Sequence, residues 1–296
     1  MQDRSLLAAI AILAALGAPA AEAQMDLSRY PDLKGQWVRW GPSGPDLKGP
    51  LVRNGPPGFN STRFDPSRPP GRGQQPPLTP EYQALFEANL KDQAAGGQGT
   101  TPTYACLSPG MPRVTNGYGE YEFVVTPDTT YILLQHINDD RRIFTDGRDW
   151  PGAELEPTYL GYSIGKWIDT TGSGRYDLLD IETRGPFKGP RTFDSGGAPL
   201  HKDNQTIVKE RIYLDNADPN LLHDDVTVID HALTRPWTVN KAYGRETDKQ
   251  PIWAEVNCGE NNNHVKIGNE GYMLSADGFL MPAKKGQAPP DLRYFK

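Results

Sequence analysis

The sequence predicts a mainly β protein whose antiparallel meander closes into a barrel-like or sandwich domain, with one packing helix near residues 80–95. Three observations predict this class. From residue 121 onward, segments rich in β-branched and aromatic residues alternate with short turn signals, which favours sequential hairpins over crossover helices. Only one segment has the apolar spacing of an amphipathic helix. The chain also contains 28 prolines and 31 glycines, a composition typical of many turns and irregular loops.

The N-terminus has the pattern of a secretory signal peptide over residues 1–23. A short region with the single cation Arg4 precedes an apolar run at 6–16, and the Ala21–Ala23 stretch supplies the small residues that signal peptidases read. We expect cleavage before Gln24 and a periplasmic or secreted protein. The apolar run is shorter than the roughly 20 residues that span a bilayer, so we expect no stable membrane insertion.

Residues 24–78 form an irregular segment in which proline, glycine and arginine are dense. Such a composition cannot supply a packed core, so we expect this segment to wrap the surface of the domain. Its start differs, because Gln36 and Trp37 follow a glycine turn and can begin a strand. We expect the rest of the chain, residues 79–296, to be a single β domain that includes the helix.

The expected helix begins after Thr79, which can cap its N-terminus. Pro80 suits the first helical position, and the carboxylate of Glu81 interacts favourably with the helix dipole. Gly96 and Gly97 end the helix. The apolar residues that share one face, and that we expect to pack on the sheet, are Tyr82, Leu85, Phe86 and Leu90.

Hairpin turns are expected at Pro127-Asp128, at Thr171–Gly174 and at Asp215–Asn220. Between them lie segments with the composition of strands. The expected strands are 122–126, 129–137, 141–145, 158–168, 176–184, 206–214, 222–229, 235–243 and 252–256.

The chain has two cysteines, Cys106 and Cys258, and an exported protein with an even count pairs them in a disulfide. Closing a loop of roughly 150 residues stabilises the fold by on the order of 4–5 kcal/mol in the chain-entropy model. Two unpaired buried thiols are the alternative. The formal net charge of −6, without clustered lysine and arginine, argues against a nucleic-acid-binding surface.

Five stretches together resemble landmarks of a broad group of exported, uncharacterised bacterial proteins. The stretches are Cys106–Arg113, Arg142–Arg148, Gly161–Trp167, Glu210–Ile212 and Leu233–Val239. This resemblance covers most of the chain after residue 30, and it implies a shared architecture and export but no activity. The group usually shows Pro-His-Ser near Pro199, whereas here Leu200 intervenes before His201 and Lys202 replaces the serine, so the resemblance carries no role to His201.

A second resemblance concerns the start of the meander. Gly35-Gln36-Trp37 is similar to the Gly-x-Trp opening of lipocalin-like barrels. The resemblance implies a calycin-like barrel, while a tryptophan that plugs one end of any β structure would look the same.

None of the five histidines has a partner at the spacing of a metal site, so the sequence predicts no bound metal and no cofactor. His136 lies in an expected strand and is interpreted as a core residue. His201 follows a glycine-rich loop and is the preferred catalytic residue, as an acid/base near Asp146. His223 and His231 bracket acidic residues that could hold a cation, although a solvated strand edge is the simpler interpretation.

The loop at 145–151 is the densest polar and aromatic cluster of the sequence. Arg148 can bind a carboxylate group through two hydrogen bonds while Trp150 stacks on the ligand. The alternative is structural: Asp146 and Gly147 form a turn, and Arg148 pairs locally.

The strand that follows has glycine or serine at 161, 163 and 165, on one face between Tyr159 and Trp167. Glycine in a strand marks a bend, a bulge or the close approach of another group. A bend is the simpler interpretation, and a cavity floor bounded by two aromatic rings is the functional one. We therefore predict that Arg148, Trp150, Tyr159, Trp167 and Trp37 are the ligand-binding residues.

The absence of a recognisable nucleophile or metal motif favours an exported small-molecule-binding protein with a pocket for a partly aromatic or anionic ligand. The first alternative is a hydrolase or lyase that acts on a small substrate with a histidine acid/base. The second is an envelope structural or interaction protein. The sequence leaves open whether the protein is an enzyme.

Overall fold

The computed structural model describes residues 25–42, 51–53, 76–100, 102–116, 119–135, 139–152, 154–194, 196–260, 262–268, 270–291 and 293. The expected signal peptide, its cleavage site before Gln24, His136 and most of the irregular segment 24–78 lie outside these residues. Within the described part of the chain, no helix combines the length and the apolar character that crossing a bilayer requires.

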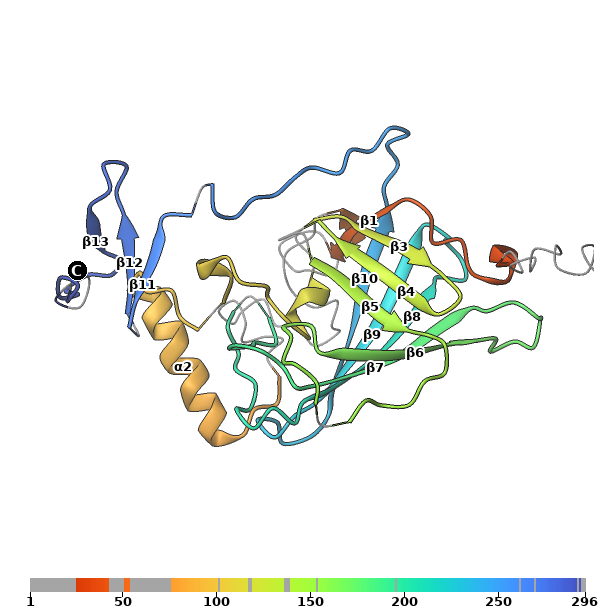
Figure 1. Ribbon diagram of the computed structural model, residues 1–296, viewed down its shortest axis with the longest axis horizontal. Coiled ribbons are helices and arrows are strands. Elements are labelled where there is room, and N and C mark those ends of the chain that lie inside the picture. The colour runs from red at the N-terminus through yellow and green to blue at the C-terminus, as the bar shows by residue number, and fades with distance from the viewer. Residues whose placement is uncertain are drawn as a thin grey trace, which may run out of the picture.

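The main body is a closed barrel of nine strands (Figure 1). The strands of its sheet are β1 (Gln36–Pro42), β2 (Leu51–Arg53), β3 (Tyr121–Val125), β4 (Thr129–Leu134), β5 (Asp139–Phe144), β6 (Tyr162–Ile168), β7 (Leu178–Arg184), β8 (Ile207–Leu214), β9 (Leu221–Ile229) and β10 (Trp237–Arg245). Strands β3 to β10 follow one another around the wall, and β1 pairs with both β3 and β10, which closes the ring. The short strand β2 is added outside the ring, on β1. The mainly β class with a barrel is therefore confirmed.

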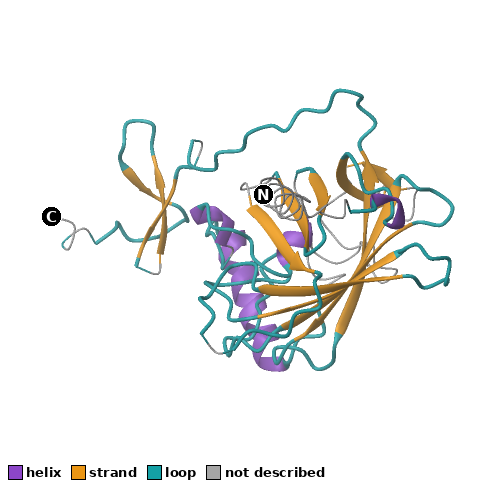
Figure 2. Cartoon of the chain, turned by 45° about the vertical axis from the view of Figure 1, so that its right-hand side comes forward, coloured by secondary structure: helices purple, strands orange, loops and turns teal. Residues whose placement is uncertain are grey.

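Neighbouring strands are antiparallel except β5 and β6, which pair in parallel with Ile143 opposite Ser163. A parallel pair needs a long return connection, and residues 145–161 supply it. Each strand expected between residues 122 and 243 is present, with ends displaced by a few residues. The strand expected at 252–256 is wrong, because this segment has no strand pairing and belongs to an extended link between β10 and the C-terminal strands (Figures 1 and 2).

Three further strands, which the sequence did not predict, form a separate sheet that we call the C-terminal meander. They are β11 (His264–Ile267), β12 (Glu270–Leu274) and β13 (Leu280–Pro282). The strands are short and largely exposed, so they lack the apolar alternation by which strands are recognised. Figures 1 and 2 place this meander at the C-terminal end of the helix, away from the barrel wall.

The helix α2 (Pro80–Ala94) has the predicted ends. The Thr79 side chain accepts a hydrogen bond from the Tyr82 N–H, and Gly96 follows the helix with a φ of +91° that favours glycine. The buried face consists of Tyr82, Phe86 and Asn89. The expected place of Leu85 in the packing face is wrong: 51% of Leu85 is exposed, because it lies at the edge of the arc that faces the barrel.

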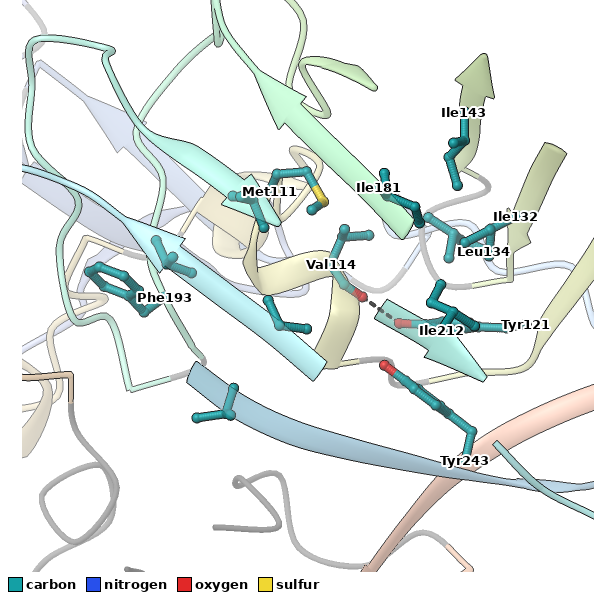
Figure 3. Packing of buried hydrophobic residues seen from close by; sticks show 14 of the residues in the cluster. Met111, Val114, Tyr121, Ile132, Leu134, Ile143, Ile181, Phe193, Ile212 and Tyr243 are labelled. Carbon is teal, nitrogen blue, oxygen red and sulfur yellow. Dashed lines mark hydrogen bonds between the residues drawn. The ribbon is translucent and has the colours of Figure 1, made fainter. Parts of the chain in front are cut away.

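The barrel interior is filled. The 3-10 helix η3 (Arg113–Asn116) is buried, and the Tyr121 and Tyr243 hydroxyls donate hydrogen bonds to its carbonyl groups. Side chains from all around the wall pack against it (Figure 3). Trp37 is fully buried, and its indole N–H donates to the Leu33 carbonyl at 3.0 Å. The remaining internal cavity is about 20 Å³, enough for one water molecule and too small for an organic ligand.

An ion pair lies within this interior. The Arg141 guanidinium donates two hydrogen bonds to the Glu210 carboxylate and a third, at 3.0 Å, to the Thr183 hydroxyl. Both charged side chains are buried, with 3% and 0% exposed. Ser163 shares a 2.8 Å hydrogen bond with Thr183, which extends the network across the four strands β5 to β8. Hydrogen bonds to both ions are what allow a charge pair to be buried without a large loss of stability.

Two further ionisable groups are buried beside this pair. Burial lowers the pKa of Lys241 to about 7, and its ammonium group donates to the Thr115 hydroxyl and, at 2.8 Å, to the Asn116 amide oxygen of η3. Burial, together with the nearby Glu210 carboxylate, raises the pKa of Asp224 well above its usual range. The barrel is therefore closed around η3 by polar contacts as well as apolar ones.

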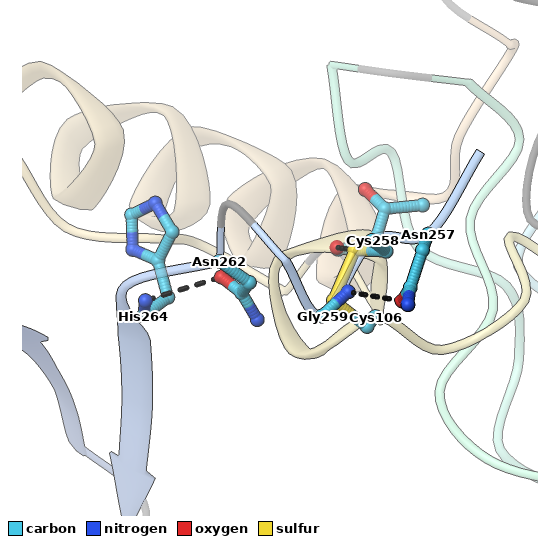
Figure 4. Close-up of a disulfide and its surroundings, with 7 residues drawn as sticks. Cys106, Asn257, Cys258, Gly259, Asn262 and His264 are labelled. Carbon is cyan, nitrogen blue, oxygen red and sulfur yellow. Dashed lines mark hydrogen bonds between the residues drawn. A yellow bond between two sulfur atoms is a disulfide. The ribbon is translucent and has the colours of Figure 1, made fainter.

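The predicted disulfide between Cys106 and Cys258 is present (Figure 4). Its Cα atoms are 5.5 Å apart, within the usual range, and it joins residues 152 positions apart. It fastens the residue after η2 (Pro102–Ala105) to the end of the extended link, next to the meander. A structural disulfide fits a protein exported to an oxidising compartment.

We predict that Glu210→Gln destabilises the protein by about 3–5 kcal/mol, because the substitution leaves the Arg141 guanidinium buried without a compensating charge. Glu182 is the matched control: it pairs with Lys209 on the exposed face, and Glu182→Gln is expected to cost less than about 1 kcal/mol. Urea unfolding measures both. The double variant Arg141→Met/Glu210→Leu should recover much of the loss, and equal effects of the two single variants would contradict the prediction.

We also predict that replacing both cysteines by serine loosens the meander and leaves the barrel folded. The last barrel strand, β10, ends at Arg245, before the disulfide at Cys258, so the strand pairing of the barrel does not include the cross-linked residues. The covalent constraint that is lost corresponds to about 5 kcal/mol in the chain-entropy model. Hydrogen exchange should become faster in β12 and stay unchanged in β8. Faster exchange throughout both sheets would show that the disulfide supports the barrel itself.

Candidate functional site

The predicted ligand residues lie on opposite faces of the barrel wall. Arg148 is on the outer face, where its guanidinium pairs with the Asp146 carboxylate at 2.6 Å and lies 3.9 Å from the centre of the Phe144 ring. It also donates to the outward-facing Tyr162 hydroxyl at 3.3 Å. Because side chains alternate along a strand, Trp167, five residues after Tyr162, points into the barrel, and its indole N–H donates to Thr130 at 3.1 Å.

The prediction that Arg148, Tyr159 and Trp167 border one cavity is therefore wrong. Tyr159 lies in the connection before β6, with the Lys188 ammonium 5.4 Å from the centre of its ring. The indole of Trp150 packs under the Arg184 guanidinium, 4.3 Å away. These contacts are those of the structural alternative, in which the loop at 145–151 pairs and packs locally.

The predicted cavity floor in β6 is also wrong. A Cβ atom on Gly165 would lie 2.6 Å from a methyl carbon of Ile143, so this glycine allows close packing within the core. Gly161 precedes the strand with a φ of +70° and bends the chain. Trp37, the fifth predicted ligand residue, is fully buried in the core.

His201 instead belongs to a cluster that the sequence did not predict. The Asp203 carboxylate lies between two imidazoles, with one oxygen 2.9 Å from His201 Nδ1 and the other 2.5 Å from His231 Nδ1. The two rings meet edge to face, 5.6 Å between centres. The carboxylate beside His201 is thus Asp203, in place of the expected Asp146, which pairs with Arg148.

Strand register brings the cluster together. Strands β8 and β9 are antiparallel, with Ile207 opposite Ile229, so the residues just before β8 lie beside those just after β9. Asp203 lies near the end of the long connection between β7 and β8, and His231 is the second residue after β9. Twenty-eight residues separate them in sequence, so no local spacing could reveal the contact.

Buried groups beneath the cluster hold its loops in place. Asp230 accepts hydrogen bonds from the His201 N–H at 2.9 Å and from the Thr206 hydroxyl at 2.5 Å. Arg191 donates to Thr206 at 3.0 Å, and burial lowers the pKa of Arg191 to about 10. The Tyr82 ring of α2 packs against His201, 5.2 Å between centres. His201 and Asp203 are thereby presented by a loop with fixed geometry.

The charges within the cluster stabilise one another. Partial burial raises the pKa of Asp203, but hydrogen bonds from His231, from the Gln205 N–H and from His201 outweigh this effect and hold the pKa well below its usual range. The hydrogen bond with Asp203 in turn raises the pKa of His231 above 6.5.

The less favoured alternative for His223 and His231, a cation site that groups the two, is wrong. They lie toward opposite ends of β9, and residues eight positions apart in a strand are separated by roughly 26 Å. His223 contacts Asp215 at 3.1 Å, while Asp224 faces the barrel interior. Only His231 reaches the cluster around Asp203.

A second candidate site is a cleft of about 610 Å³ between α2, the segment after it and the C-terminal meander, which we call the helix–meander cleft. One part of its wall is mostly apolar and includes Leu85, Ala88, Pro102, Tyr104, Leu107 and Pro199. The other part is charged and includes Asp92, Lys266, Glu270 and Lys284. The sequence could not predict this cleft, because the meander that forms one side was not recognised.

Polar contacts hold the two sides of this cleft together. Lys284 of the meander pairs with Asp92 of α2 at 3.0 Å and with Glu270 at 3.2 Å. The amide of Gln98 contacts His264 Nδ1 at 2.8 Å. Together with the disulfide at its edge, these contacts make the cleft a defined feature of the fold.

No family model, no curated protein and no solved structure matches the chain. The support for both candidate sites is therefore their geometry in the structure.

We predict that Asp203→Asn lowers the pKa of His231 toward the ordinary value of 6.5, because the substitution removes the carboxylate that stabilises its imidazolium. NMR titration of the histidine ring protons measures this. Asp146→Asn is the control variant, because that carboxylate pairs with Arg148, and it should leave the pKa of His231 unchanged. An unchanged midpoint for His231 in Asp203→Asn would show that its contact with Asp203 does not form in solution.

Proposed function

We propose that this chain is an exported small-molecule-binding protein whose ligand occupies the helix–meander cleft. The observation that carries the proposal is the combination of size and lining in this cleft. Its volume of about 610 Å³ lies within the range of about 300–1,000 Å³ typical of small-molecule sites, and its wall combines apolar side chains with amide, hydroxyl and charged groups.

The lining indicates the kind of ligand. Leu85, Ala88 and Tyr104 offer an apolar surface for an aliphatic or aromatic body. Lys284 is occupied by its two ion pairs, whereas Lys266 is exposed and makes no ion pair among the described residues. An anionic group near Lys266, with an apolar body along α2, is the arrangement that these side chains favour.

The structure of α2 supports this function. The buried residues of α2, Tyr82, Phe86 and Asn89, fix the helix on the barrel. The next residues around the helix line the cleft, and these are Leu85, Ala88 and Asp92. Leu85 is half exposed and lines the cleft, so its apolar side chain is available to a ligand. The signal pattern at residues 1–23 and the disulfide support export, so we place the ligand outside the cytoplasm.

We predict that the fluorescent aromatic sulfonate 1-anilinonaphthalene-8-sulfonate binds the folded protein at one site and that Ala88→Trp abolishes this binding. The indole would fill the space beside Leu85. Ala84→Trp is the matched control, because Ala84 is exposed on the same helix and does not line the cleft. Lys266→Gln should weaken binding by up to about fivefold, since an exposed ion pair contributes at most about 1 kcal/mol.

Fluorescence titration at a temperature far below the unfolding midpoint measures these affinities. Equal binding by the Ala88→Trp and Ala84→Trp variants would place the probe elsewhere and contradict the proposal. Mass spectrometry of an organic extract of the protein purified from its own cell envelope then identifies the natural ligand.

A further inference from the structure

We propose that His201, Asp203 and His231 form a binding site for a divalent transition metal ion, of which zinc is the best match. This inference goes beyond the proposed ligand cleft and does not depend on it. The cluster lies where the β7–β8 connection meets the end of β9, and it uses none of the residues that line the cleft.

The distances between the ligand atoms fit a metal ion. One nitrogen or oxygen atom from each of the three residues lies within 4.8 Å of the other two. Ligand atoms around a tetrahedral zinc ion, with bonds of about 2.0–2.1 Å, are separated by about 3.3 Å. The two shortest separations here, 2.9 Å and 2.5 Å, are those of hydrogen bonds to the carboxylate. These two contacts are made by different oxygens of the Asp203 carboxylate, so an ion bound to both imidazoles would be held by that carboxylate through one oxygen or through both.

The ligand types select the class of ion. Two imidazole nitrogens and one carboxylate oxygen are the ligands of many catalytic zinc sites and of non-haem iron sites. Calcium and magnesium prefer sites made of oxygen atoms, so the two histidines disfavour them. Both cysteines are in the disulfide, so thiolate ligands are excluded.

The cluster combines fixed ligands with one that can adjust. The loop with His201 and Asp203 is held in place by Asp230, which accepts hydrogen bonds from the His201 backbone N–H and from the Thr206 hydroxyl. His231 is 69% exposed, so its ring can rotate to complete the coordination. Such an arrangement accepts an ion from solvent without rebuilding the loop.

Three protein ligands leave at least one coordination position open. His201 and Asp203 are about one-quarter exposed, so this position faces solvent and is available to water or to a small anion. A site of this kind holds an exchangeable ion, in contrast to a structural zinc site with four protein ligands.

The other described histidines provide matched controls. His223 contacts the single carboxylate Asp215, and His264 contacts the Gln98 amide and the Tyr104 ring. Neither belongs to a group of three potential ligands in the part of the chain that the structure describes.

The test uses the tag-free, full-length mature protein, stripped with a chelator and titrated with Zn²⁺ by calorimetry. We expect one ion per chain. His231→Ala and Asp203→Ala should each weaken binding by more than about tenfold, and His264→Ala should leave it unchanged. Co²⁺ should give the intense visible absorption of a four-coordinate site, and His231→Ala should abolish it.

His231 is exposed, so its alanine variant is expected to fold, and circular dichroism verifies this for each variant. Absence of Zn²⁺ binding to the stripped protein would overturn the proposal. So would binding that is the same with and without His231, because the ion would then lie elsewhere. The Zn²⁺ titration and the sulfonate titration test separate proposals. Ala88→Trp blocks the helix–meander cleft and leaves the three metal ligands intact, so it should abolish binding of the sulfonate and keep binding of Zn²⁺.

Discussion

The buried ion pair between Arg141 and Glu210 determines what this barrel can hold. A charged pair is stable in a protein interior only when hydrogen bonds offset the loss of water. Here Arg141 donates two hydrogen bonds to Glu210 and a third to Thr183, while its Nε–H has no hydrogen-bond partner among the described residues. The pair occupies the space between β5 and β8, and η3 fills the adjoining space through its contacts with Tyr121 and Tyr243. A nine-stranded barrel filled in this way has room for one water molecule. Among the described residues, the larger cleft that could take a small molecule therefore lies outside the barrel wall.

Both candidate sites follow from this constraint. The histidine cluster lies on loops at one end of the wall, where the register of β8 and β9 fixes Asp203 beside His231. The helix–meander cleft lies outside the barrel, where α2 uses one row of side chains to pack and the next row to face the meander. Loops and added elements on a rigid scaffold commonly carry function, because they can vary without loss of the core.

The candidate sites were less predictable than the fold. His201 was singled out from its place after a glycine-rich loop, and the structure puts it in a cluster of three potential metal ligands. Its partners were not predictable from local spacing, because Asp203 meets His231 across a strand pair, 28 residues away in sequence. Arg148 and Trp167 were grouped because they are close in sequence, whereas the alternation of side chains along β6 sends Trp167 inward and leaves Arg148 outside.

By itself, the sequence determined the features that arise from local physics. These are the strands of the barrel, the caps of α2 at Thr79 and Gly96, and, with only two cysteines, the disulfide partner of Cys106. Only the tertiary structure decided that the barrel is filled by η3 and that the meander forms one side of a cleft. It also decided that His231 meets Asp203. Each of these depends on contacts between residues far apart in the chain, and those contacts are set by strand register and core packing, which no short segment encodes.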